Sequence, residues 1–309
     1  MSATHLTLVG PTASGKTQLA LDLARTLGDI EIVSVDSMQV YRGLDIGTAK
    51  PTPAERATVP HHLIDVADPS EDWSVARFQT AAREAVAAIE ARGHRALLVG
   101  GTGLYVQAVV DDLRFPGEDL ELRAELEVGT SEPGGVAAAY AELSELDPDA
   151  AARIDPHNAR RIVRALEVIR LTGKPFSSFG SGVGSFGPTA FPVRMAGVWL
   201  PRAVLAGRIA RRFAAMREAG LVDEVRRLAG SNGGLSRTAG QAIGYKELLA
   251  HFEGAEPSVD AALETATRRT RSFARRQRMW FRRDPRITWY GAGENPASVR
   301  PALLASWSR

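Results

Sequence analysis

The chain has 309 residues, of which 44% are hydrophobic and 24% are charged, and it contains no cysteine. This composition is typical of a globular protein, and it excludes disulfides, iron–sulfur clusters and zinc sites built on cysteine. The sequence has neither a run of about eighteen apolar residues nor a signal-peptide pattern at its start, so we expect a cytoplasmic protein without a membrane span.

Charge is distributed unevenly along the chain. Residues 1–190 carry 17 Lys+Arg against 26 Asp+Glu, whereas residues 191–309 carry 21 against 10. A basic C-terminal part indicates a polyanionic partner, although a solvated basic surface is the more ordinary interpretation of such a charge excess.

The first motif is GPTASGKT, which matches the pattern G-x-x-x-x-G-K-[ST]. The apolar stretch Leu6–Val9 leads into it as a predicted strand, and Thr17–Leu27 follows as a predicted helix, which is the context that a phosphate-binding P-loop requires. In such a loop backbone N–H groups surround phosphate oxygens, the lysine adds positive charge, and the threonine hydroxyl can bind Mg²⁺. We therefore expect phosphate binding by Gly10, Pro11, Thr12, Ala13, Ser14, Gly15, Lys16 and Thr17. The motif alone leaves open whether the ligand is ATP, GTP or another diphosphate.

Further strands are predicted at Glu31–Asp36, Ala96–Gly100, Met195–Leu200 and Ile287–Tyr290, with helical patterns between most of them. One such helix covers Val75–Ala91 and ends before Gly93. This alternation predicts an α/β fold, a P-loop NTPase-like parallel sheet flanked by helices on both faces.

The alternation of predicted strands and helices is interrupted between about residue 114 and residue 192. This segment begins RFPGEDLELRAELE, continues through helical patterns, and loosens into the Gly/Ser-rich stretch 177–187. We predict a first part of the P-loop core at 1–113, a helical insertion domain with a mobile Gly/Ser-rich return linker at 114–192, and a second part of the core, with a basic C-terminal helix, at 193–309.

Asp36 stands at the carboxyl end of the second predicted strand, beside the expected ligand crevice. That position suits a carboxylate that hydrogen-bonds a nucleophile and takes its proton, but a cap on the next turn, formed together with Ser37, is the competing interpretation. The pair His61–His62 has no further histidine at ligand spacing, which favours hydrogen-bonded structural roles over a metal site.

Taken in order, GPTASGKT, VDSMQVYRGLDIGTAKP, PHHLIDV, VGGTGLYVQA, RRIVRALEV, QAIGYKEL and FARRQRMWFRRD closely resemble the motifs of the tRNA dimethylallyltransferases, from residue 5 to about residue 290. Without cysteine, the chain is similar to the compact bacterial form, since eukaryotic members often add a zinc finger. The resemblance implies that the P-loop grips the diphosphate of dimethylallyl diphosphate as a leaving group, with Mg²⁺, and that the acceptor is N6 of adenine 37 in the tRNA anticodon stem-loop. We expect a monomer.

The resemblance also implies roles for individual residues. Asp36 matches the general base that orients N6, and Lys16, Mg²⁺ on Thr17 and the loop N–H groups from Ala13 to Gly15 would stabilise the leaving diphosphate. Arg212 and Arg208 lie in a matching R-I-x-x-R-F pattern, and we rank Arg212 first as the arginine that reaches the diphosphate. The competing interpretation for both is a surface arginine on an amphipathic helix.

On the acceptor side, an adenine inside a stacked loop must be extruded to reach the site. Asp36, Ser37, Met38, Gln39 and Thr102 resemble the family's contacts to that base and its neighbours. Backbone contacts are implied for Arg123, Arg160, Arg161, Arg164, Gln241, Lys246, Arg276 and Arg282. In the segment RRTRSFARRQRMWFRRDPR we also predict a phosphate-binding stripe of Arg268, Arg271, Arg275, Arg278 and Arg282, with Phe273 and Trp280 as core anchors. Gly100, Gly101 and Gly103 permit either a close backbone approach or an ordinary tight turn.

Three alternatives remain at this point. A small-molecule or nucleotide kinase would share the P-loop and the strand-end acid, but it would leave the arginines without a role. Prenyl transfer to free AMP or ATP would use the same chemistry on another acceptor. A non-catalytic tRNA-binding protein would keep the arginines and have no use for Lys16, Thr17 and Asp36 together.

Overall fold

The structure is a computed structural model that describes residues 4–111, 113–179 and 183–308. The chain divides into two compact units: unit 1 comprises Met1–Asp112 and Phe186–Arg309, and unit 2 comprises Leu113–Ser185. The predicted return linker 177–187 includes residues 180–182, which lie outside the described ranges.

Unit 1 is built on one sheet of six strands. They are β1 (His5–Val9), β2 (Ile30–Val35), β3 (His61–His62), β4 (Arg95–Gly100), β5 (Val193–Trp199) and β6 (Ile287–Gly291). The spatial order is β3-β2-β4-β1-β5-β6 and every pairing is parallel. The predicted parallel sheet is therefore confirmed. The short β3 was missed because two half-buried histidines form no apolar run.

The central strands β1, β2 and β4 are buried on both faces, which explains why they are rich in apolar residues. In β2, Ile30 and Ile32 belong to one apolar cluster while Val33 and Val35 belong to another. The first cluster includes side chains of α1 (Lys16–Leu27) and α13 (Arg300–Trp307), and the second includes those of α3 (Val75–Ala91) and α4 (Gly103–Val110). Helices thus cover both faces, as predicted.

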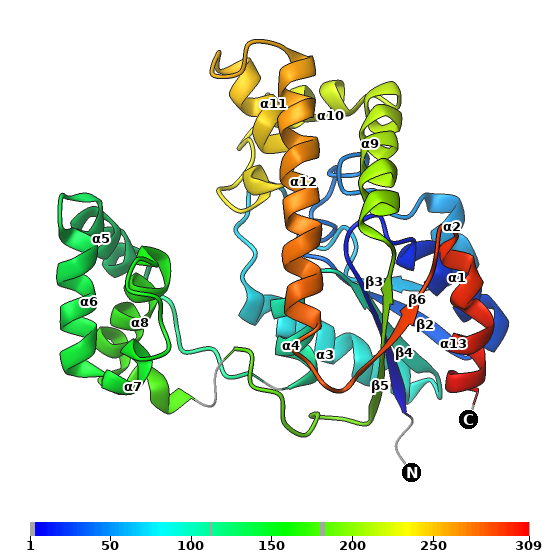
Figure 1. Cartoon of the computed structure of the whole chain (residues 1–309), viewed down its shortest axis with the longest axis horizontal. Helices are drawn as coiled ribbons and strands as arrows, with labels where there is room; N and C mark the ends of the chain where they lie inside the picture. Colours follow the sequence, from blue (N-terminus) through cyan, green and yellow to red (C-terminus); the bar gives the residue numbers. More distant parts are fainter. Residues whose placement is uncertain (1–3, 112, 180–182, 309) are drawn as a thin grey trace. The chain divides into compact units, whose positions relative to one another are not determined.

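The carboxyl ends of the strands meet a further group of helices (Figure 1). Its members are α9 (Arg202–Glu218), α10 (Leu221–Ala229), α11 (Tyr245–Phe252) and the long α12 (Val259–Phe281). Helix α12 contacts α9, α11 and α4. The short helix α2 (Pro53–Thr58) completes the α-helices of unit 1. Among the described residues, no helix is long and apolar enough to cross a membrane.

Unit 2 is helical. It contains α5 (Leu120–Ser131), α6 (Gly135–Leu146), α7 (Pro148–Ala151) and α8 (Ala159–Thr172), followed by the 3₁₀ turn η1 (Phe176–Phe179). Its core gathers Leu126, Leu143, Ile162 and Leu166 from three of these helices. The unit therefore has an apolar core of its own.

The boundary of the second part of the core differs slightly from the prediction. Residues 186–192, expected in the insertion, belong to unit 1. Ala190 N–H donates to Val110 O at 2.8 Å, His5 N–H donates to Pro192 O at 2.9 Å, and the Phe191 ring packs edge-on against His5. These contacts join the return segment to the sheet before β5 begins, and no local pattern in the sequence signals them.

Candidate active site

The P-loop lies between β1 and α1, and its backbone turns sharply. Ala13 has φ 62° and Gly15 has φ 84°, so both are in the left-handed region. At Gly15 a side chain would also collide with Pro296, whose Cβ and Cγ would be 2.6 Å from an added Cβ. Within the loop, Ser14 N–H donates to Pro11 O at 3.2 Å. The consensus glycine is thus required by both backbone conformation and packing.

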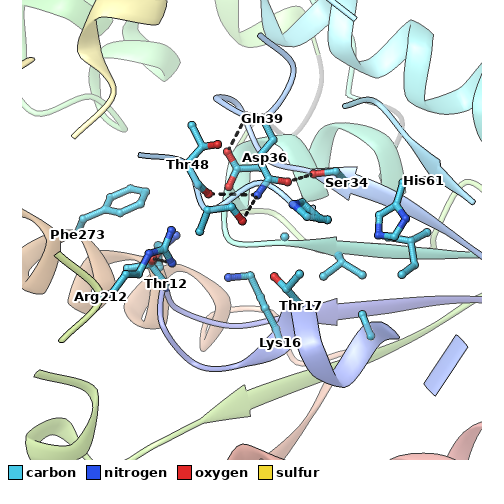
Figure 2. A pocket seen from close by; sticks show the side chains of 17 residues that line it. Thr12, Lys16, Thr17, Ser34, Asp36, Gln39, Thr48, His61, Arg212 and Phe273 are labelled. Carbon is cyan, nitrogen blue, oxygen red and sulfur yellow. Dashed lines mark hydrogen bonds between the residues drawn. The ribbon is translucent and has the colours of Figure 1, made fainter. Parts of the chain in front are cut away.

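A cavity opens where the P-loop faces the ends of β2 and β4 (Figure 2). Figure 2 shows the side chains of Lys16 and Thr17 directed toward the side of the cavity that carries Asp36. Arg212, from α9, lines the same cavity. Thr12, Gln39 and Gly100, which were also singled out from the sequence, line it too. Four of the five predicted catalytic side chains therefore meet in one place.

The cavity has the charge distribution of an anion-binding site, in which one carboxylate faces two cations. Desolvation lowers the pKa of Lys16 to about 8; the Asp36 carboxylate opposes this shift and Arg212 adds to it. Burial also lowers the pKa of Arg212, again opposed by Asp36. Among the described residues, neither cation has a carboxylate in direct salt-bridge contact, and two such desolvated cations are suited to a negatively charged ligand.

The two arginines of α9 make different contacts. Arg212 Nη1 donates to Thr12 Oγ1 at 3.3 Å and the residue lines the cavity. Arg208 Nε donates to Ala13 O at 2.8 Å, so it supports the P-loop backbone, and it is not among the cavity-lining residues. This geometry favours Arg212 as the arginine that contacts a ligand.

Asp36 caps the turn that follows β2 and also lines the cavity. Its Oδ1 accepts hydrogen bonds from Met38 N–H at 2.9 Å and Gln39 N–H at 3.3 Å. In the described part of the chain, no hydrogen bond to its Oδ2 is observed. The two interpretations of Asp36 are therefore compatible: one oxygen orients the carboxylate and the other is available to a ligand.

The loop after Asp36 is held by buried charges. The Glu224 carboxylate of α10 accepts hydrogen bonds from the N–H groups of Asp45, Ile46 and Gly47 and from the Tyr245 hydroxyl. Burial raises the pKa of Tyr245, which keeps this hydroxyl a donor. No local pattern predicted this role of Glu224, because its three backbone partners lie about 180 residues away.

Lys50 closes the same loop from the other side. Its ammonium group donates to Tyr41 O at 2.8 Å and to the carboxylates of Asp45 and Asp65 at 2.6 Å each. The Gln39 amide lies beneath the loop, accepting from Ser34 Oγ at 2.8 Å and donating to Thr48 O at 3.3 Å. The wall of the cavity formed by Gln39 and Thr48 is thus rigidly supported.

The other predicted base-contacting residues surround this wall. Thr102 Oγ1 accepts from Ser37 N–H at 3.4 Å, which links the ends of β2 and β4. Met38 packs against the apolar cluster on the α3 and α4 side of the sheet. Ser37, Met38 and Thr102 are not among the residues that line the cavity.

Several lining residues were not predicted. Gln277 and Phe273 reach the cavity from α12, and Ser34, Thr48 and His61 reach it from β2, the following loop and β3. The prediction that Phe273 is a core anchor is wrong, because the half-buried ring lines the cavity instead. Trp280 does pack against the core, where an added Cβ on Gly103 would be 2.2 Å from its Cδ1. The periodicity of the sequence places both aromatic residues on α12, but it does not determine what each side chain contacts.

The two histidines are hydrogen-bonded. His61 Nδ1 lies 2.7 Å from Val59 O, and His62 Nε2 lies 2.7 Å from Glu31 Oε2. A hydrogen bond from Arg92 is the main cause that holds the pKa of Glu31 at about 2. Within the described residues there is no group of three acidic or histidine side chains that could bind a metal by itself.

A divalent cation is nevertheless compatible with the cavity. Mg²⁺ commonly binds through one or two protein oxygens, substrate phosphates and water, so it needs no cluster of acids. The Thr17 hydroxyl lines the cavity opposite the Asp36 carboxylate, and among the described residues it has no hydrogen-bond partner. The Thr17 hydroxyl is the group that fits such an ion, with substrate phosphate and water as its other ligands.

A second, basic groove lies between α11 and α12. It measures ≈ 400 Å³ and is lined by Gln241, Ile243, Lys246, Glu247, Arg268, Arg269, Ser272 and Arg276. Lys246 Nζ donates to Gln241 Oε1, and Arg269 pairs with the buried Glu247. The predicted residues Gln241, Lys246 and Arg276 thus come together here.

Most of the predicted arginine stripe lies outside this groove. Of its five members only Arg268 lines the groove, where its neighbours are Arg269 and Arg276. Arg278 lies over the Trp199 ring, 5.1 Å from its centroid. Arg271, Arg275 and Arg282 are exposed elsewhere on the helix. Spacings of three and four drift by only about 20° per seven residues, so these positions stay on one side of α12, beside the face that lines the groove.

In unit 2 the structure separates the predicted arginines into two pairs. Arg123 and Arg164 both bind the carboxylate of Glu167, which is fully buried, with Nη to Oε2 distances of 2.9 Å. A phosphate could recruit either arginine only by weakening this buried ion pair, which does not favour tRNA contact by Arg123 or Arg164. Arg160 and Arg161 are exposed.

Two family models match the chain: one described as IPP transferase over residues 39–284 and one described as isopentenyl transferase over residues 3–66. A tRNA dimethylallyltransferase of Streptomyces coelicolor is 48% identical, with 97% of this chain and 94% of the relative covered. One of Kineococcus radiotolerans is 49% identical, with 96% and 94% covered.

Solved structures agree with this result. A tRNA isopentenylpyrophosphate transferase of Bacillus halodurans is 40% identical with a TM-score of 0.70, covering 99% of this chain and 98% of that one. A eukaryotic dimethylallyltransferase acting on tRNA is 27% identical with a TM-score of 0.79, covering 98% and 78%.

The depressed pKa of Lys16 predicts how anion binding depends on pH. We expect the affinity for inorganic diphosphate to fall as the pH rises above about 8, because the ammonium group then loses its proton. Isothermal titration calorimetry of wild type and Lys16→Met across this range measures the effect, and the variant corrects for ionisation of diphosphate itself. Equal pH dependence in both proteins would contradict the assignment.

Proposed function

The chain belongs to the tRNA dimethylallyltransferase family, and from that premise we propose that it transfers a dimethylallyl group from dimethylallyl diphosphate to N6 of adenine 37 in tRNA. The observation that carries the proposal is the single cavity in which Lys16, Thr17 and Arg212 face the carboxylate of Asp36. One side of it suits a diphosphate and the other suits a nucleophile that must lose a proton.

The donor would lie with its diphosphate against the P-loop. As the bond between the allylic carbon and the diphosphate oxygen breaks, its electron pair stays on the leaving group and negative charge accumulates there. Lys16 and Arg212, both desolvated, are placed to stabilise that charge. Arg208 acts indirectly, because its hydrogen bond to Ala13 O supports the P-loop. A Mg²⁺ ion held by Thr17 and water would supply further charge compensation.

The acceptor adenine would enter from the side of Asp36. The N6 lone pair forms the new bond to the allylic carbon, and the N6 proton passes to Asp36 Oδ2, while Oδ1 stays bound to the turn at Met38 and Gln39. Phe273 offers an aromatic face at the cavity wall on which an extruded base can stack. Removing a proton while the base is positioned compensates for the weak nucleophilicity of this amine.

The basic groove between α11 and α12 supports tRNA as the acceptor. Lys246, Arg268 and Arg276 line it without a buried carboxylate partner of their own among the described residues, unlike Arg269. Exposed cations of this kind bind backbone phosphates by releasing counterions. Free AMP would have no use for them, and a kinase would not explain them either, so neither alternative is favoured.

Both substrate regions described so far lie in unit 1 of one chain. We therefore propose that a monomer is sufficient for catalysis and that Arg160 and Arg161 of unit 2 provide additional contacts to tRNA. Because its acceptor is tRNA, we propose that the protein works in the cytoplasm.

Transfer of label tests the function directly. Purified protein incubated with radiolabelled dimethylallyl diphosphate and Mg²⁺ should label unmodified tRNA as N6-dimethylallyladenosine, as nucleoside analysis would detect, and should leave AMP unlabelled. Labelled AMP would show that the acceptor is a free nucleotide and not tRNA. An absence of transfer to either acceptor would return the kinase alternative to consideration.

Asp36→Asn tests the base. Asparagine keeps the Oδ1 acceptor for the turn but cannot take a proton, so we expect the single-turnover transfer rate to fall by about 10²–10⁴ while the tRNA Kd changes little. Asp68→Asn is the matched control, because Asp68 Oδ1 accepts from Ser70 N–H in a similar turn outside the cavity. A transfer rate near wild type in Asp36→Asn would show that Asp36 is not the base.

Arg276→Ala tests the groove. We expect weaker tRNA binding and an unchanged diphosphate Kd. The slope of log K for tRNA against the logarithm of the salt concentration should become shallower by roughly one, because one phosphate contact is lost. Arg25→Ala, at the C-terminal end of α1 and away from the groove, is the control. Binding isotherms at several salt concentrations measure the slope, and identical slopes in the two variants would remove Arg276 from the tRNA surface.

A further inference from the structure

One buried side chain joins the two halves of the proposed active site. Gln277 of α12 is 7% exposed and lines the cavity. Its Oε1 accepts a hydrogen bond from Thr12 N–H of the P-loop at 2.8 Å, and its Nε2 donates to Gly101 O, after β4, at 2.9 Å. An N–H group can only donate and a carbonyl can only accept, so these two partners determine the orientation of the amide.

The connection extends beyond Gln277. The same Thr12 accepts a hydrogen bond on its Oγ1 from Arg212. A continuous series of hydrogen bonds therefore runs from Gly101 through Gln277 and Thr12 to Arg212. This series links the turn at Gly101 to Arg212, the arginine proposed to contact the diphosphate.

The packing around this series leaves little room for independent movement. A Cβ on Gly101 would lie 2.4 Å from Gln277 Nε2 and 3.2 Å from Gly10 O. One turn further along α12, Trp280 fills the space in front of Gly103. A displacement of α12 must therefore change the position of Gln277 relative to Thr12 and Gly101, since tightly packed interiors transmit small shifts.

We propose that Gln277 is a positioning residue that couples tRNA binding on α12 to the geometry of the diphosphate site. The proposal rests on the function proposed above, because the groove residues Arg268 and Arg276 belong to the same helix as Gln277. Binding of tRNA to that helix stabilises the arrangement in which Gln277 holds Thr12, and Thr12 in turn holds Arg212. By linkage, a bound diphosphate must then strengthen tRNA binding by the same factor.

The coupling can be measured with inorganic diphosphate and an anticodon stem-loop. We expect the stem-loop to tighten the diphosphate Kd of the wild type by at least about fivefold, the lower end of typical coupling between sites. In Gln277→Met, which loses both hydrogen bonds at similar side-chain length, this factor should fall to about one and kcat should fall with it. Gln79→Met is the matched control, because Gln79 Nε2 also donates to a backbone carbonyl, Ala108 O, on the other side of the sheet from the P-loop helix.

A second variant distinguishes positioning from simple loss of folding. In Gln277→Glu the ionised carboxylate still accepts from Thr12 N–H but repels Gly101 O, whereas the protonated acid reproduces both hydrogen bonds of the amide. The kcat of this variant relative to wild type should therefore recover as the pH is lowered, and the coupling factor should recover with it. A disrupted fold would not respond in this way, and thermal unfolding of each variant checks it.

Several results would overturn the proposal. They are a wild-type coupling factor of one, a Gln277→Met variant with the wild-type coupling factor and kcat, an equal loss in Gln79→Met, and a Gln277→Glu variant whose relative kcat does not change with pH. A wild type that binds no stem-loop or transfers no label would instead refute the proposed function itself, so the two failures are distinguishable.

Discussion

The strained backbone between β1 and α1 determines where the ligand-binding groups of the site lie. Ala13 and Gly15 are both left-handed, and an alanine in that region carries strain of about 1–3 kcal/mol that the surroundings must offset. Three distant parts of the chain hold the loop in place: Pro296 against Gly15, Arg208 on Ala13 O, and Gln277 on Thr12 N–H. The conformation of the loop is therefore supported by contacts within the protein itself.

The opposite wall of the cavity is stabilised by a different kind of interaction. There Val40 and Leu44 anchor the loop after Asp36 in the apolar core. Buried ionic groups hold its backbone as well: Glu224 accepts from backbone N–H groups, and Lys50 donates to two carboxylates and a carbonyl. Buried charges persist only where every hydrogen-bonding position is used, as it is at these two residues. Such a network tolerates little displacement, which suits a wall that must orient a weak nucleophile.

The arginines of α12 have different roles, although they are close together in the sequence. Some line the groove, Arg269 compensates the buried Glu247, and Arg278 lies on an aromatic ring. Arg123 and Arg164 similarly support the interior of unit 2 through Glu167. A basic segment therefore combines residues that stabilise the fold with residues that remain available to a polyanion, and only the latter can contribute to binding.

The features that could be predicted from the amino-acid sequence are those that depend on neighbours along the chain. The P-loop, the apolar strands and the strand-end position of Asp36 follow from local backbone geometry and from periodicity, and the ordered motifs identified the family. The features that could not be predicted involve residues that are far apart in the sequence. Gln277 meets Thr12 across 265 positions, Phe273 turns out to line the cavity, and Arg123 pairs with Glu167 from another helix. Hydrogen bonds and ion pairs of this kind form only when packing brings the groups together, and no local pattern encodes which side of a helix will meet which loop.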